Sequence, residues 1–258
     1  FNASNLTISN NVLLSSSVET YHGAGVYMNN SGTVNLTNCT ITGNISQATN
    51  HELYDAGAIY NRNTVLVLDN CYISENTSVQ GVGGINVYGA SASLNLKNCT
   101  ISDNEGVYGA MYFFRTDDIT STTIQGCTIQ GNTGTYASAI NTNNINFKII
   151  IKDSIISDNI GPYAILNNEM SSSEPKTKVQ VGGATVISGN KTSNNVSANV
   201  FLPSSETIEI ISPLTTDASI GVTRSLSGRL TVGYGAHNPS DDPATHFFSD
   251  VTTSVVEE

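Results

Sequence analysis

Three pairs of acidic residues are the side chains best suited to chemistry in this chain of 258 residues. A sugar-cleaving hydrolase needs two carboxyl groups that face each other across its substrate, and a lyase needs carboxylates clustered around Ca²⁺ beside a basic residue. The candidates are Asp117 with Asp118 beside Arg115, Asp153 with Asp158, and Asp241 with Asp242.

None of these pairs has the arrangement that such catalysis requires. Adjacent residues on a strand point to opposite faces, which separates Asp117 from Asp118. Asp158 occupies a position that is acidic in other copies of a repeat, and Asp241 and Asp242 lie in a Pro-rich loop. The four His residues, at 22, 51, 237 and 246, share no spacing. We therefore expect no catalytic residues, no metal and no cofactor.

A recurring set of tyrosines is the stronger indication of a binding surface. These residues precede or follow a repeated small-residue motif, and alternation along a strand predicts that several point outward along one flank. Aromatic rings with a polar tip are good platforms for sugars and protein partners. The alternative is that they only cover the corners of a repeated coil. The flank comprises Tyr21, Tyr27, Tyr54, Tyr60, Tyr108, Tyr112, Tyr136 and Tyr163.

A repeat of 27 to 33 residues must position these side chains. The segment "NLTNCTITGN" (35–44) recurs as "VLDNCYISEN" (67–76), "NLKNCTISDN" (95–104), "TIQGCTIQGN" (123–132) and "IIKDSIISDN" (150–159), with fainter copies ending at Asn11 and Asn190. Half a repeat later, a small residue precedes an apolar one, as in "GAIY" (57–60). Fixed periods of this length are the signature of solenoids.

The segments between turns are short, rich in β-branched residues and alternating, which predicts strands. Each strand can pair in parallel with its copy one coil later, at a spacing of about 4.8 Å. Right-handed winding is favoured for parallel strands. The sequence therefore predicts an all-β, single-stranded, right-handed parallel β-helix of about seven coils over residues 1–202. Residues 203–258, where the period is lost, are predicted to form capping strands and a loop of the same domain.

Two columns of the repeat are expected to be architectural. The Asn that ends each copy falls where the strand must turn, so we expect it to adopt the left-handed conformation and to form a ladder of stacked amides. The slot five residues earlier holds Cys39, Cys71, Cys99 and Cys127, followed by Ser154 and Thr185. Parallel side chains about 4.8 Å apart cannot form disulfides or a tetrahedral metal site, so we expect buried free thiols.

The charge balance limits the classes of partner. Ten Lys and Arg against 21 Asp and Glu give a net charge of −11, which argues against nucleic acid as a partner. No apolar run is long enough to span a membrane, so we expect no membrane insertion by this segment. The sequence opens at Phe1 inside the repeat pattern, so we expect a module of a longer secreted or surface protein. We expect this module to be monomeric.

The combination of "GAIY" or "GAMY" (109–112) with "ITGN", "ISEN", "ISDN" and "IQGN" resembles the GGAI and FxxN repeats of polymorphic outer-membrane-protein adhesins. It is more similar still to the adhesin-like right-handed parallel β-helix repeat proteins of gut bacteria and methanogenic archaea. This resemblance implies extracellular display on a cell surface and non-catalytic adhesion to glycans or proteins of a host, of microbes or of the diet. A purely structural stalk and a carbohydrate-active lyase or hydrolase are the alternatives.

Overall fold

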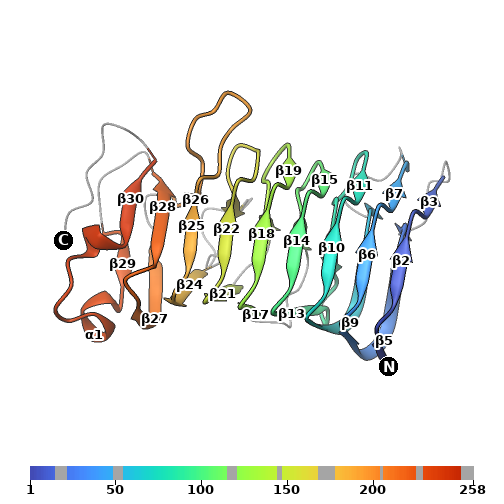
Figure 1. Cartoon of the computed structure of the whole chain (residues 1–258), viewed down its shortest axis with the longest axis horizontal. Coiled ribbons are helices and arrows are strands. Elements are labelled where there is room, and N and C mark those ends of the chain that lie inside the picture. Colours follow the sequence, from blue (N-terminus) through green and yellow to red (C-terminus); the bar gives the residue numbers. More distant parts are fainter. Residues whose placement is uncertain are drawn as a thin grey trace.

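Short strands pair in parallel with their copies one coil further along the chain throughout the computed structural model. The structure describes residues 1–14, 22–48, 55–114, 121–143, 147–167, 178–203, 206–224 and 229–250. The coils stack into a rod, with the N-terminus at one end and the last strands at the other (Figure 1). The molecule is a right-handed parallel β-solenoid of about seven turns, as the sequence predicted.

Three columns of strands form most of the wall. The first contains β1 (Asn2–Ser4), the second halves of β5 (Val26–Thr37) and β9 (Ile59–Asp69), β13 (Ser93–Lys97), β17 (Ser121–Gln125), β21 (Lys148–Lys152), β24 (Lys178–Gly183), β27 (Ile208–Leu214) and β29 (Thr231–Val232). The second contains β2 (Thr7–Ser9), β6 (Thr40–Thr42), β10 (Tyr72–Ser74), β14 (Thr100–Ser102), β18 (Thr128–Gln130), β22 (Ile155–Ser157), β25 (Val186–Ser188), β28 (Ser219–Thr223) and β30 (Phe247–Ser249). The third contains the first halves of β5 and β9, then β12 (Ile85–Tyr88), β16 (Met111–Phe114), β20 (Ile140–Asn143), β23 (Ile165–Asn167) and β26 (Val200–Phe201).

Two smaller sheets follow the second column. One consists of β3 (Val12–Leu13), β7 (Ile45–Ser46), β11 (Thr77–Ser78), β15 (Glu105–Gly106) and β19 (Thr133–Gly134), and the other pairs β4 (His22–Gly23) with β8 (Asp55–Ala56). The loop that joins β25 to β26 projects beyond the rod (Figure 1).

The register places like residues next to one another inside the rod. Ile73 pairs with Ile41 on one side and with Ile101 on the other, and all three are buried. Alternation sends their neighbours Thr40, Tyr72 and Thr100 outward, so each strand supplies one apolar side chain to a continuous core. A one-residue slip would exchange the two faces, and the Ile column therefore fixes the register.

The left-handed backbone conformation predicted for the Asn column lies one residue earlier in the structure. From Asn44 to Asn190 the ladder asparagines do not have positive φ; the residue before each of these six does, at Gly43, Glu75, Asp103, Gly131, Asp158 and Gly189. The Asn itself turns inward and is buried. The left-handed position therefore falls on exposed or partly exposed Gly and acidic residues, while the amide is left free to bond inside the rod.

The Asn ladder itself is confirmed and has a direction. The Nδ2 of Asn104 donates to the Oδ1 of Asn132 at 3.0 Å, and the Oδ1 of Asn104 accepts from the Nδ2 of Asn76 at 2.9 Å. The backbone N–H of each member donates to that same Oδ1 of the next coil. The bonds from one amide to the next therefore all point toward the C-terminal end of the rod, while the Nδ2 of Asn104 also donates back to the carbonyl of Ile73 in the previous coil. The ladder runs through Asn11, Asn44, Asn76, Asn104, Asn132, Asn159, Asn190 and Asn199.

The cysteines are free and buried, which confirms the second predicted column. The Sγ of Cys99 donates to the carbonyl of Leu68 in the previous coil at 3.4 Å, and the backbone N–H of Cys99 donates to the Sγ of Cys127 at 3.4 Å. Ser154 takes the same place, since its Oγ bonds the carbonyl of Ile124. The slot thus selects a small side chain that can donate and accept across a corner.

The strand columns continue beyond the predicted division at residues 202 and 203. β27 pairs in parallel with β24, and β28 pairs with β25, so that Ile187, Ile220 and Phe247 extend the Ile column. A short helix, α1 (Tyr234–His237), and a 3₁₀ turn, η1 (Pro243–Thr245), interrupt the pattern only between the last strands. The repeat motif fades from the sequence before the coil geometry ends.

Candidate functional site

The described part of the tyrosine flank lies outside the main core, and three of its six tyrosines (Tyr60, Tyr108 and Tyr112) are buried. Tyr27, Tyr60, Asn86, Tyr112 and Asn141 occupy successive coils of one register column. Their strand neighbours point into the main core, so these five side chains point away from it, as the alternation predicted. All except Tyr27 are nonetheless buried, and Tyr27 is 46% exposed.

Two small apolar clusters, separate from the main core, account for part of this burial. Tyr60 packs with Ala56 and Tyr88, with Phe114 against them. Tyr108 and Tyr112 pack with Val82, again beside Phe114. Half of the described flank therefore belongs to a second apolar layer outside the coil, and the other half keeps surface that a partner can contact.

Three rings of the flank form a continuous stack. Tyr112 and Tyr108 have ring centroids 4.7 Å apart with planes 15° from parallel, and Tyr108 and Tyr136 have centroids 5.2 Å apart at 19°. The first two rings are buried, whereas Tyr136 is 46% exposed. The ring of Tyr136 is thus held on one side by a rigid aromatic base and offers its remaining surface to solvent.

The other members of the flank divide into separate groups. Tyr27 stacks on buried Tyr60 with centroids 5.7 Å apart, which gives a second supported and half-exposed ring. Tyr163 is partly buried and packs against Phe201 at 4.6 Å. Tyr21 and Tyr54 lie outside the described residues.

The candidate carboxylate pairs serve the architecture where they are described. Asp153 has a φ of 49° and its Oδ1 accepts the N–H of Ala184 in the next coil at 3.0 Å. Asp158 has a φ of 57°, in the same turn slot as Glu75 and Asp103. Gly, Asn and Asp adopt positive φ more easily than other residues, so the turn geometry accounts for both aspartates.

The third pair acts in local turns near the C-terminal end. The Oδ2 of Asp241 accepts from Asn238, and the Oδ1 of Asp242 accepts the N–H of Ala244 at the start of η1. Arg115, Asp117 and Asp118 lie outside the described residues. Over the described ranges, no group of three or more His, Cys, Asp or Glu side chains is placed to hold a metal ion.

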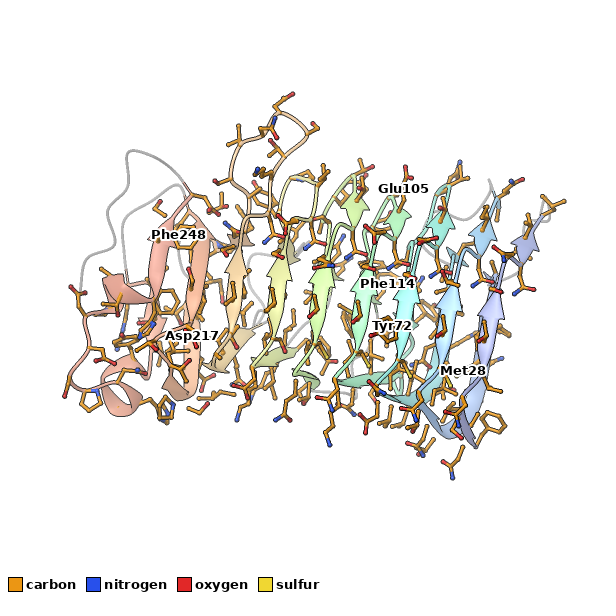
Figure 2. The ribbon with its side chains drawn as sticks, in the orientation of Figure 1. Met28, Tyr72, Glu105, Phe114, Asp217 and Phe248 are labelled. Carbon is orange, nitrogen blue, oxygen red and sulfur yellow. The ribbon has the colours of Figure 1, made fainter. Side chains whose placement is uncertain are left out.

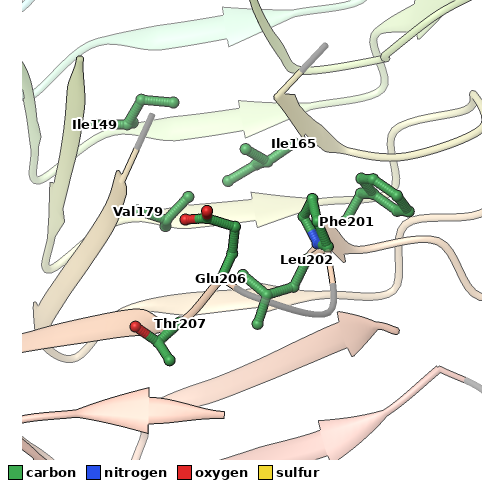
Figure 3. A pocket seen from close by; sticks show the side chains of 8 residues that line it. Ile149, Ile165, Val179, Phe201, Leu202, Glu206 and Thr207 are labelled. Atoms are coloured by element: carbon green, nitrogen blue, oxygen red, sulfur yellow. The ribbon is translucent and has the colours of Figure 1, made fainter. Parts of the chain in front are cut away.

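One small hollow opens near the C-terminal part of the core (Figure 3). It is lined mainly by apolar side chains, with Glu206 and Thr207 at its edge. The apolar members are Ile149, Ile165, Val179, Phe201, Leu202 and Pro203. The apolar lining is continuous with the core, and only Glu206 and Thr207 bring polar side chains to this hollow.

Two ladder residues near the C-terminus were missed at the level of sequence. Asn199 follows Asn190 by only 9 residues, because the projecting loop returns the chain to the same corner. Asp250 then accepts both the N–H and the Nδ2 of Asn199, at 2.8 and 2.6 Å, and also the hydroxyl of Thr223. A carboxylate thus ends the ladder, and the only signal in the sequence is an acidic residue after "HFFS".

The described residues contain no helix that is long and apolar enough to cross a membrane. Comparison with known families finds a match to the family described as "Right handed beta helix region", which covers residues 1–201. The chain belongs to this family. No curated protein matches the chain, and no solved structure matches it.

Proposed function

We propose that this right-handed β-helix protein is a non-catalytic module of a cell-surface adhesin that binds glycans or proteins outside the cell. The proposal is supported by the use of its polar residues. The described members of the carboxylate pairs complete turns, the asparagines form the ladder, and the thiols bridge a corner. What is left for a partner is the outer surface of a stiff rod.

The observation that carries the proposal is the stack that ends in Tyr136. The ring of Tyr136 is already held by Tyr108 and Tyr112, so little conformational entropy is lost when a partner packs on its free surface. Rigid aromatic side chains with a polar tip dominate many binding sites for this reason. Tyr27, which is supported by Tyr60, offers a second ring of the same kind.

A structural stalk is the alternative, and the regularity of the rod favours it. The second column presents mainly Thr and Ser on its outer face, with exposed Tyr72 among them (Figure 2). A surface of mainly hydroxyl side chains, interrupted by exposed Tyr72, Ile155 and Phe248, is suited to a spacer that projects other domains.

A binding panel of glycans and extracellular-matrix proteins separates these two functions. We expect saturable binding by the purified module and a loss of about tenfold or more on Tyr136→Ala or Tyr27→Ala, because an aromatic anchor is removed. Tyr72→Ala is the matched control, since its ring is also exposed (55%) but lies on β10, far from the stack in the coil. Absence of binding to every member of the panel would favour the stalk.

A further inference from the structure

The outer face of the first column gathers an unusual share of the positive charge. Four of the eight Lys and Arg residues in the described ranges lie there, in a molecule whose net charge is −11. We call them the lysine patch: Lys97 on β13, Lys148 and Lys152 on β21, and Lys178 on β24.

Strand pairing brings these lysines together in space. Lys148 and Lys178 are direct neighbours in adjacent coils. Lys97 and Lys152 share another register column with Gln125 between them, which separates them by about 10 Å at two coil spacings. All four are exposed or partly exposed. On β21 the inward positions are taken by Ile149 and Ile151, so Lys148 and Lys152 point outward.

The carboxylates that border the patch are bonded to other groups. Asp69, one coil before Lys97, accepts from the Nδ2 of Asn98 at 3.5 Å, and Asp153 accepts the N–H of Ala184. Glu209 accepts from Gln180 at 2.5 Å. Asp69 stands directly opposite Lys97, whereas the register neighbours of Lys148 are Ser121 and Lys178.

Like charges directly opposite each other in a sheet destabilise it. The pairing of Lys148 with Lys178 therefore lowers the stability of the folded state, in a chain that has only ten Lys and Arg residues. An arrangement that costs stability without a local compensation is expected at functional positions. An anionic partner would supply the missing compensation.

We propose that the lysine patch binds an acidic polysaccharide, at a site separate from the tyrosine stack. Ser121, Thr123 and Gln125 lie on the same face of β17 between the lysines and provide partners for sugar hydroxyls. Duplex DNA carries a charge about every 1.7 Å and is repelled by the net negative molecule. A polysaccharide with widely spaced carboxylate or sulfate groups matches the spacing of four separated lysines. Salt screens charges over about 8–10 Å, which limits the repulsion between this polymer and the acidic remainder of the surface.

The test is binding of the 258-residue module to polygalacturonate and to chondroitin sulfate, with neutral dextran and duplex DNA as competing classes, at about 50 and 200 mM salt. We expect binding to one or both acidic polysaccharides that weakens with salt. The Lys148→Gln, Lys178→Gln double variant should bind about tenfold more weakly, with a salt slope lower by about two. Lys148→Arg with Lys178→Arg should retain binding, and Lys191→Gln, an exposed cation on the projecting loop, is the matched control.

Thermal unfolding gives a second readout that a purely structural role would not produce. The Gln double variant should unfold at the same temperature as the parent or higher, because a repulsion is removed. The proposal is overturned if no acidic polysaccharide binds at low salt, if the double variant binds normally, or if DNA binds as tightly. Tyr136→Ala should not affect this binding, so failure here is distinct from failure of the tyrosine platform.

Discussion

Two columns of stacked side chains run along interior corners of this rod. One consists of asparagines, and the other consists of thiols and hydroxyls. The Asn column accepts a single residue type in every coil from Asn44 to Asn190, whereas the other accepts Cys, Ser and Thr. The side chain of Asn104 takes part in four hydrogen bonds of 2.9–3.2 Å, to both neighbouring coils. The thiol of Cys99 donates to two carbonyls at 3.2 and 3.4 Å.

The difference follows from what each side chain must do. Only a carboxamide combines two donor hydrogens with an acceptor oxygen at that reach, so no other residue can replace Asn without leaving buried groups unpaired. The second corner needs only one small group that can donate and accept. Strict repetition therefore marks a residue whose hydrogen bonds are all used, and tolerance marks one whose bonds are few and weak.

Asn104→Ala tests the first half of this comparison and should have the largest effect. It removes the acceptor for two N–H groups of Asn76 and the donor to the carbonyl of Ile73, all of them buried. Unpaired buried groups cost about 1–3 kcal/mol each, so we expect a loss of about 3 kcal/mol or more in the free energy of unfolding. Denaturant titration measures it, with outward-facing Asn95→Ala as the control. A loss below about 1 kcal/mol would contradict a structural role for the ladder.

Asp250→Asn tests how the same column ends. The carboxylate accepts from the N–H and Nδ2 of Asn199 and from the hydroxyl of Thr223, whereas an amide must present its own NH₂ to one of these donors. Hydrogen bonds to charged groups contribute about 1.5–3 kcal/mol, so we expect a loss of about 2 kcal/mol. Hydrogen exchange should rise first at the amides of Asn190 and Asn199. Unchanged exchange there would show that Asp250 does not hold the end of the ladder.

The thiol column should respond weakly to substitution and more clearly to alkaline pH. Cys99→Ser keeps a donor and an acceptor in the slot, as Ser154 does, so we expect a change below about 1 kcal/mol. The hydrogen bond with the side chain of Cys127, together with burial, raises the pKa of Cys99 to about 11. Because the folded state favours the neutral thiol, stability is full below the ordinary pKa of about 9 and falls as pH rises toward 11.

Denaturation curves between those two pH values check this, with the Ser variant as the matched control. The hydrogen bond with Cys99 also raises the pKa of Cys71. Thiol-specific reagents at neutral pH should therefore modify Cys71 and Cys99 slowly until the protein unfolds. Rapid modification of Cys71 or Cys99 in the folded protein would contradict the buried column.

The repeat made most of the fold predictable. Because the Ile and Asn positions recur at a nearly constant period, strand type, parallel pairing, the ladder and the free thiols all followed from spacing. The left-handed residue was misplaced by one position, since Asn is itself a frequent left-handed residue and the sequence does not show which of two adjacent turn residues takes that backbone. Alternation placed Tyr27, Tyr60 and Tyr112 on the side away from the main core, but the burial of Tyr60 and Tyr112 was not foreseen.

The sequence alone determined the architecture, because stacking identical short segments is the one way for all of them to bury their apolar side chains and pair their backbones. Only the tertiary structure decided which outward-facing groups are exposed. Alternation distinguishes the two sides of a strand, but it does not tell whether a second layer covers the outer side, as it does at Tyr60 and Tyr112. The end of the ladder at Asp250 and the meeting of Lys148 with Lys178 likewise depend on contacts between residues distant in the chain.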